Sequence, residues 1–231
     1  MGKYKDKLIV SADDFGTSPE ANKNILTLVR LGKVDRLALL IDGYFTQSEI
    51  IKLLNSRVKM DIHLNFEFYQ STKRRAEEGV IRRLFRFFGY YFLGKISREK
   101  IEESWKKQIE KFRDIIGKNP DGINSHQYLH FSPPYFKVIL ELARKFNIHY
   151  IRFGRKGIIK SRNNVAKILN LLYKKNKKTF YFSRLESSDF LISLDWVKDF
   201  PQFLKKLPDG QTEIVCHPER EEEFKIIKTY L

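Results

Sequence analysis

Residues 8–16 read LIVSADDFG, an apolar run that ends in two adjacent carboxylates. Side chains on a strand alternate between its two faces, so Asp13 and Asp14 cannot both point the same way inside a regular strand. The stretch therefore predicts a buried β-strand that breaks where the two aspartates stand.

Short β-like runs alternate with helix-like segments along the rest of the chain. The expected strands cover residues 8–12, 36–42, 59–66, 121–126, 149–154, 188–194 and 212–218, with 179–184 as a candidate eighth. The expected helices cover residues 19–31, 46–56, 98–117, 136–146, 162–175, 196–207 and 219–231. This alternation favours a mainly parallel sheet covered by helices. The sequence therefore predicts an α/β fold, a short or distorted TIM-like (β/α) barrel, because a full barrel typically needs about 250 residues.

One segment breaks this rhythm. Residues 70–95, approximately, are basic and aromatic and follow the third expected strand. We expect a helical insertion there, over the carboxyl ends of the strands, which acts as a lid or packs as a hairpin with its own core. With this insertion, residues 1–231 are expected to form a single domain.

Composition excludes some classes of site. The chain has 231 residues, and 42% of them are hydrophobic. Its single cysteine, Cys216, excludes an internal disulfide framework and a cysteine-based zinc cluster. No apolar run of about 18 residues or signal-like leader is present, so we expect a cytoplasmic protein without a transmembrane segment.

The formal charge is +16, but the basic residues are dispersed and no RNA-binding motif accompanies them. We expect a solvated basic surface and no nucleic-acid partner, with another anionic partner as the alternative.

The histidines are not scattered at random. Four of the five lie at or just after the carboxyl end of an expected strand: His63, His126, His130 and His217. In an α/β barrel, loops from different strands converge at that end to form the active site. The two aspartates end the first strand on the same rim, so they are expected to face a shared cleft.

Two imidazoles and one carboxylate are a common ligand set for a divalent metal. Asp14 with His63 and either His126 or His130 would supply that set. Asp13 would then remain a base beside the metal, and the cation would offset the repulsion between the two carboxylates. A metal site would therefore explain why two aspartates stand next to each other.

The motifs at these positions resemble those of the YdjC-like carbohydrate deacetylases. They are ADDFG at residues 12–16, HLN at 63–65, SHQYLHFSP at 125–133 and CHP at 216–218. The resemblance spans almost the whole chain, and four ordered motifs are more specific than any one of them. That family includes chitooligosaccharide deacetylases and relatives that act on hopanoid-linked sugars. The resemblance implies a TIM-like barrel, a divalent cation that is usually magnesium, with zinc also compatible, and a homodimer in some members.

The resemblance also implies roles for single residues. Asp14, His63 and His126 match the metal ligands of the family. Asp13 matches the general base, and His217 matches the general acid. The expected reaction is therefore metal-assisted hydrolysis of an N-acetyl group on an amino sugar or oligosaccharide.

Two further residues and three departures complete the comparison. Arg152 and His130 match positions that imply contact with substrate. Asn124 stands where the family commonly has Asp, Tyr128 replaces a histidine, and Glu219 replaces a glycine. We expect the first two changes to remove polar groups near the metal. All three bear on substrate identity more than on the core chemistry.

Two other functions stay open at this point. A metal-dependent phosphoesterase would use the positive charge of the chain to attract an anionic substrate. A non-catalytic anion-binding protein on the same fold would use that charge without turnover. An N-acetylated carbohydrate remains the expected substrate.

Overall fold

The computed structural model describes residues 4, 6–66 and 97–231. Within these ranges, eight strands form one parallel sheet in the order β5-β4-β3-β2-β1-β8-β7-β6. The strands are β1 (Leu8–Phe15), β2 (Arg36–Leu39), β3 (Lys59–Leu64), β4 (Gly122–Ser125), β5 (Tyr150–Ile151), β6 (Gly157–Ile158), β7 (Phe190–Ser193) and β8 (Thr212–Cys216). The insertion expected at about 70–95 lies outside the described residues.

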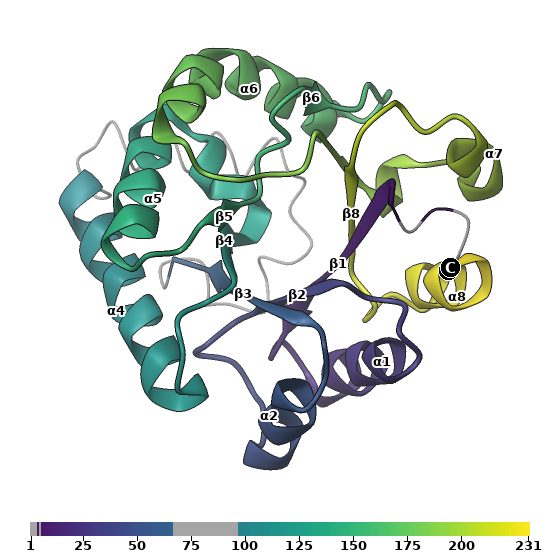
Figure 1. The fold of residues 1–231 in the computed structure, drawn as a ribbon, viewed down its shortest axis with the longest axis horizontal. Helices are drawn as coiled ribbons and strands as arrows, with labels where there is room; N and C mark the ends of the chain where they lie inside the picture. Colours follow the sequence, from purple (N-terminus) through teal and green to yellow (C-terminus); the bar gives the residue numbers. More distant parts are fainter. Residues whose placement is uncertain (1–3, 5, 67–96) are drawn as a thin grey trace.

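The sheet curls, and helices lie around the outside of the strands (Figure 1). They are α1 (Pro19–Arg30), α2 (Gln47–Leu54), α4 (Arg98–Ile116), α5 (Pro133–Lys145), α6 (Asn164–Ser183), α7 (Phe200–Lys205) and α8 (Glu221–Tyr230), with the short 3-10 helices η3 (His126–Phe131) and η4 (Leu194–Trp196). This arrangement confirms the predicted α/β, TIM-like barrel. In the described part of the chain, no helix has both the length and the apolar character that crossing a membrane requires.

One short run of chain closes the barrel. β5 pairs with β4 on one side, and Tyr150 also forms an isolated parallel bridge with Glu186, shortly before β7. A few residues later β6 pairs with β7. Residues 150–158 therefore change partner strand midway and join the two ends of the sheet.

Both faces of the sheet are buried, and besides apolar side chains they carry buried polar ones such as Ser11, Arg36 and Glu213. Every residue of β2, β4 and β8 is buried. The longer helices add one apolar stripe each; the apolar buried residues of α4 recur at intervals of three or four, and they are Ile101, Trp105, Ile109, Phe112 and Ile116. Cys216 is buried in β8.

The sequence predicted that the first strand ends at the aspartates, but β1 continues through them to Phe15 and bulges there. Its register with β2 runs from Ala12 paired with Leu37 to Phe15 paired with Leu39, so one extra residue bulges out of β1. Asp14 has a φ of 68°, a left-handed conformation that is uncommon for residues other than glycine. The bulge allows both carboxylates to reach the same pocket.

Two predictions about elements were wrong. Residues 179–184 form no strand, because α6 continues to Ser183 with Leu169, Tyr173 and Phe180 buried at helical spacing. The eighth strand is instead the two-residue β6. The helix expected at 196–207 is shorter, because the Asp199 side chain caps α7 and Pro201 stands in its first turn.

Candidate metal and catalytic site

The predicted metal ligands meet at the carboxyl ends of β1, β3 and β4. Asp14 Oδ1 lies 3.1 Å from His126 Nδ1 and 3.3 Å from His63 Nε2, and the two imidazole nitrogens are 3.3 Å apart. Neighbouring ligands bonded to one cation at about 2.1 Å are separated by about 3 Å, so the three atoms fit a divalent ion. Asp14 and His63 are buried, whereas the His126 side chain is 38% exposed. The site is therefore open on the His126 side.

The orientation of His63 is fixed from the neighbouring strand. Its Nδ1 donates a hydrogen bond to Oδ1 of Asn124, which stands beside it in the β3–β4 register. That bond leaves the lone pair of Nε2 directed at Asp14 and His126, the usual arrangement of a metal-binding histidine. The expectation that Asn124 removes a polar group near the metal is therefore wrong, because its amide oxygen accepts the bond.

Two residues of α4 hold the end of β3, and sequence reasoning missed both. Gln108 accepts a hydrogen bond from the backbone N–H of Asn65 at 3.0 Å and donates one to its carbonyl oxygen at 2.9 Å. The Trp105 indole donates to the same carbonyl at 3.1 Å. Their only sequence signal is a polar and an aromatic residue three positions apart on the apolar stripe of α4. They fix the backbone two residues after His63.

Asp13 is held by a buried arginine. Arg152 donates from NH1 to Oδ2 at 2.6 Å and from NH2 to Oδ1 at 2.7 Å. Burial alone would raise the pKa of Asp13, but the charge and the hydrogen bonds of Arg152 lower it below its ordinary value. Asp13 is therefore an ionised carboxylate at neutral pH, fixed beside the metal ligands.

A second acid holds Arg152 in turn. Glu213 of β8 accepts from Arg152 Nε at 2.7 Å and from Ser11 Oγ at 2.8 Å, while its other oxygen accepts from the Tyr150 hydroxyl at 2.7 Å. The Arg36 guanidinium lies 3.8 Å from the centre of the Tyr150 ring. A chain of buried polar contacts therefore runs through the barrel to Asp13. Sequence reasoning missed Glu213, although a lone acid inside an apolar strand could have signalled it.

His130 and Arg152 both lie behind the pocket wall and are fully buried. His130 Nε2 donates to the carbonyl oxygen of Arg152 at 2.9 Å, and its Nδ1 lies 2.7 Å from the Ser125 hydroxyl. Burial lowers the pKa of His130 to about 3, so its ring is neutral. The structure brings neither residue to the pocket lining, and their contact with substrate stays a prediction.

His217 follows β8 and lines the pocket. Its Nδ1 lies 3.7 Å from Glu223 Oε2, an ion-pair distance, and its backbone N–H donates to the same oxygen at 2.8 Å. Burial lowers the pKa of His217, but Glu223, Asp14 and Asp13 outweigh burial and raise the pKa to about 9. The imidazole therefore carries a proton at neutral pH. Sequence reasoning missed Glu223.

These groups surround one cavity of about 250 Å³. Beyond the predicted residues, its lining includes the aromatic side chains of Tyr128 and Trp196, whose ring centroids are 6.1 Å apart. The Tyr128 hydroxyl is buried and has no hydrogen-bond partner among the described residues. Asp195, Glu219 and Arg220 add charged side chains to the wall. The cavity thus combines an aromatic wall with the predicted metal ligands, the predicted base and the predicted acid.

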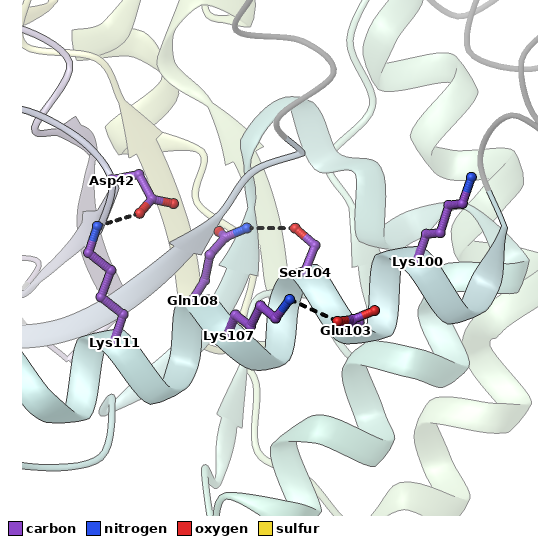
Figure 2. A pocket seen from close by; sticks show the side chains of 7 residues that line it. All are labelled: Asp42, Lys100, Glu103, Ser104, Lys107, Gln108 and Lys111. Carbon is purple, nitrogen blue, oxygen red and sulfur yellow. Dashed lines mark hydrogen bonds and ion pairs between the residues drawn. The ribbon is translucent and has the colours of Figure 1, made fainter.

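A second pocket, of about 240 Å³, lies on the outer side of α4. Figure 2 shows two pairs among its charged side chains: Lys111 with Asp42 at 2.6 Å, and Lys107 with Glu103 at 2.8 Å. It contains none of the predicted site residues. We assign it no chemistry.

Known proteins are similar to this chain in sequence. The sequence is 28% identical over 218 residues to a carbohydrate deacetylase of Halalkalibacterium halodurans, covering 92% of this chain and 84% of that protein. It is 22% identical over 161 residues to the mouse carbohydrate deacetylase, covering 66% of this chain and 52% of that protein. The chain thus spans about half the length of the mouse and human relatives.

A solved structure shares the fold. A protein of Enterococcus faecalis described as a cellobiose-phosphate cleavage protein superposes with a TM-score of 0.62 at 22% identity, covering 92% of this chain and 80% of that one. The family model described as YdjC-like protein matches residues 7–229, nearly the full chain. The match confirms the resemblance seen in the motifs, and the chain belongs to the YdjC-like protein family.

Proposed function

We propose that this protein is a metal-dependent hydrolase that removes N-acetyl groups from amino sugars or oligosaccharides. The observation that carries the proposal is the convergence of Asp14, His63 and His126 beside a buried base, Asp13, and a protonated acid, His217. Relatives named carbohydrate deacetylases support the same chemistry. We propose the N-acetylated carbohydrate as the substrate on these grounds.

The residues present fit a divalent cation. Asp14, His63 and His126 would hold it, and when bound it supplies Lewis-acid polarisation of a carbonyl and activation of water. Magnesium is the ion that the family resemblance implies, whereas two imidazole ligands also suit zinc. Measuring the metal content of the purified protein decides between them.

Asp13 is placed to act as the general base. Its carboxylate stays ionised because of Arg152, and it lines the cavity beside the metal ligands. It would take the proton of the attacking water. Arg152 is a positioning residue in this scheme, because both its NH groups hold the carboxylate oxygens in place.

His217 is placed to act as the general acid. Its raised pKa keeps the imidazole protonated at neutral pH, and it lines the same cavity. It would give that proton to the leaving amine when the amide C–N bond breaks, a step worth about 10²- to 10⁴-fold in rate. Asp13 and His217 thus hold opposite protonation states before the reaction, as the mechanism requires.

The test is the release of acetate from N-acetylated chito-oligosaccharides by the purified, metal-loaded protein. We expect turnover that a chelator abolishes and the metal restores, and that Asp13→Asn removes while metal binding persists. Release of phosphate from a panel of phosphate esters, without any release of acetate, would establish the phosphoesterase instead. Anion binding without turnover of either substrate would establish the non-catalytic alternative.

A further inference from the structure

The outer face of α6 carries a stripe of apolar and basic side chains exposed to solvent. Leu171, Lys175, Lys178 and Phe182 follow one another at intervals of four, three and four residues, so they share one side of the helix. Leu171 is 62% exposed and Phe182 is 69% exposed. Tyr181, next to Phe182, is 80% exposed, and the two ring centroids are 6.2 Å apart. Exposed apolar side chains gathered on one face mark an interaction surface.

The charge on this helix has one sign. α6 contains five lysines and no acidic residue. Lys174, Lys175, Lys177 and Lys178 are all exposed. Together with Leu171, Tyr181 and Phe182 they form what we call the α6 face.

A groove between α5 and α6 extends the α6 face. It encloses about 380 Å³ and is lined by Lys137, Leu140, Glu141, Arg144, Lys178, Thr179 and Phe182. The acid in this lining, Glu141, is neutralised by Arg98, whose NH2 lies 2.7 Å from its carboxylate. The groove therefore adds basic charge next to the exposed aromatic rings.

We propose that the α6 face docks on the surface of an anionic lipid bilayer. Lysine, leucine and aromatic side chains that share one exposed helix face suit a helix that lies against a membrane interface. The aromatic rings and Leu171 would enter the boundary between headgroups and acyl chains, while the lysine ammonium groups would remain at the lipid phosphates. Both halves of the surface are then matched by one partner.

A nucleic acid matches the α6 face less well. It would pair with the lysines, but it offers no apolar layer to cover Leu171. A bilayer covers both the charged and the apolar side chains. The docking proposal therefore commits to lipid and makes nucleic-acid binding an outcome of the test.

Docking along α6 would bring the catalytic cavity close to the lipid surface. Val165, in the first turn of α6, lines the cavity, and the α6 face begins less than two turns later at Leu171. α6 lies at the outer edge of the molecule, where a flat surface can approach it (Figure 1). The docking proposal does not depend on the deacetylase activity.

The test is flotation of the full chain with vesicles. We expect binding to vesicles of phosphatidylcholine mixed with phosphatidylglycerol, little binding to phosphatidylcholine alone, and weaker binding as salt is added. The triple variant Lys174→Gln, Lys175→Gln, Lys178→Gln should weaken binding roughly 100-fold, because each basic residue near an anionic surface contributes about 1 kcal/mol. Phe182→Ser with Tyr181→Ser should weaken binding even at low salt.

Matched controls separate this face from overall charge. Lys52→Gln, Lys205→Gln, Lys206→Gln removes the same charge from exposed positions on α2, α7 and the residue after α7, elsewhere on the barrel. This variant should float almost as well as the parent chain. Circular dichroism and thermal unfolding should show that every variant is folded. Equal loss of binding in the two triple variants would overturn the proposal, and so would failure of the parent chain to float.

A second measurement reports contact directly. Both native tryptophans are buried, so Tyr181→Trp adds an exposed reporter on the α6 face. Acyl chains that carry bromine should quench it in anionic vesicles, whereas Tyr44→Trp, at another exposed tyrosine, should show no such quenching. Unquenched Tyr181→Trp on bound vesicles, or salt-sensitive retention on single-stranded RNA without vesicle binding, would contradict docking on lipid.

Discussion

His63 donates its Nδ1 proton to the amide oxygen of Asn124, its direct neighbour in the adjacent strand. The bond fixes the tautomer in which Nε2 is free to bind a metal. Asn124→Ala removes the acceptor, so we expect metal affinity to fall about 10- to 100-fold. Asn124→Asp keeps an acceptor and should bind metal at least as tightly as the parent chain. Isothermal titration of the chelator-treated protein measures both, and an unchanged affinity in Asn124→Ala would show that the bond does not orient the ligand.

Metal binding should stabilise the folded protein. A ligand that binds only the native state at about 100 times its Kd adds about 2.7 kcal/mol, which for a chain of this size raises the Tm by several degrees. His126→Ala removes a ligand and should abolish most of that shift. The matched control is His149→Ala, at an exposed histidine outside the cluster. Thermal unfolding with and without chelator measures the shift, and a His126→Ala protein that keeps it would place the metal elsewhere.

Arg152 should affect turnover more than substrate binding. Lysine at this position keeps the charge but loses the paired NH groups that hold Asp13 and the Nε that reaches Glu213. We expect kcat to fall about 100-fold with little change in KM, since small misplacements of a catalytic group cost about that much. The free energy of unfolding should also fall by about 3 kcal/mol, because buried carboxylates lose hydrogen bonds. A raised KM at unchanged kcat would instead favour direct contact with substrate.

The charge of His217 gives a pH dependence with a defined sign. Burial lowers the pKa of His217, but in the metal-free protein Glu223, Asp14 and Asp13 outweigh burial and raise it from 6.5 to about 9. A raised pKa means that this group adds its full stability below about pH 6.5 and loses it as the pH rises through about 9. Urea unfolding at several pH values should show that loss. Histidine NMR signals should give the pKa of His217 directly. Glu223→Gln should lower that pKa, so the stability should be lost at a lower pH than in the parent chain.

The unpartnered hydroxyl of Tyr128 should matter for substrate and not for stability. Tyr128→Phe removes a buried hydroxyl that has no hydrogen-bond partner among the described residues. The free energy of unfolding should therefore stay the same or rise slightly. If the hydroxyl donates to a polar group of the substrate, kcat/KM should fall roughly 10-fold, the free energy of about one hydrogen bond. Steady-state kinetics on an N-acetylated oligosaccharide checks this. Full activity in Tyr128→Phe would leave the aromatic ring as the only contribution of this residue.

The residues alone could predict that Asp14, His63 and either His126 or His130 meet at one rim, because parallel strands bring their carboxyl ends together. The choice of His126 rested on the resemblance to the family, and the structure brings Asp14, His63 and His126 together. The direction in which a side chain points is harder to predict than its place near a strand end. Arg152 and His130 also lie near strand ends, yet the structure turns both inward, because Glu213 and Asp13 hold one and a carbonyl and a hydroxyl hold the other.

The strand that the sequence missed, β6, is too short to leave a pattern. It has two residues, too few to show the alternation of a strand. The candidate strand at residues 179–184 is rich in aromatic residues, but its buried positions continue the stripe of α6 back to Leu169. The groups that hold the site, such as Gln108, Glu213 and Glu223, act across distant parts of the chain. Their partners are set by the tertiary structure and leave no local pattern.

The run of residues that closes the barrel determines which part of the fold each part of the candidate site depends on. Arg152 stands where that run leaves β4 for β7, and its carbonyl and guanidinium groups connect His130, Glu213 and Asp13. The predicted metal ligands, by contrast, come from β1, β3 and the end of β4. A substitution that disturbs the join between the two ends of the sheet should therefore misalign Asp13, the proposed general base, while leaving the predicted metal ligands together.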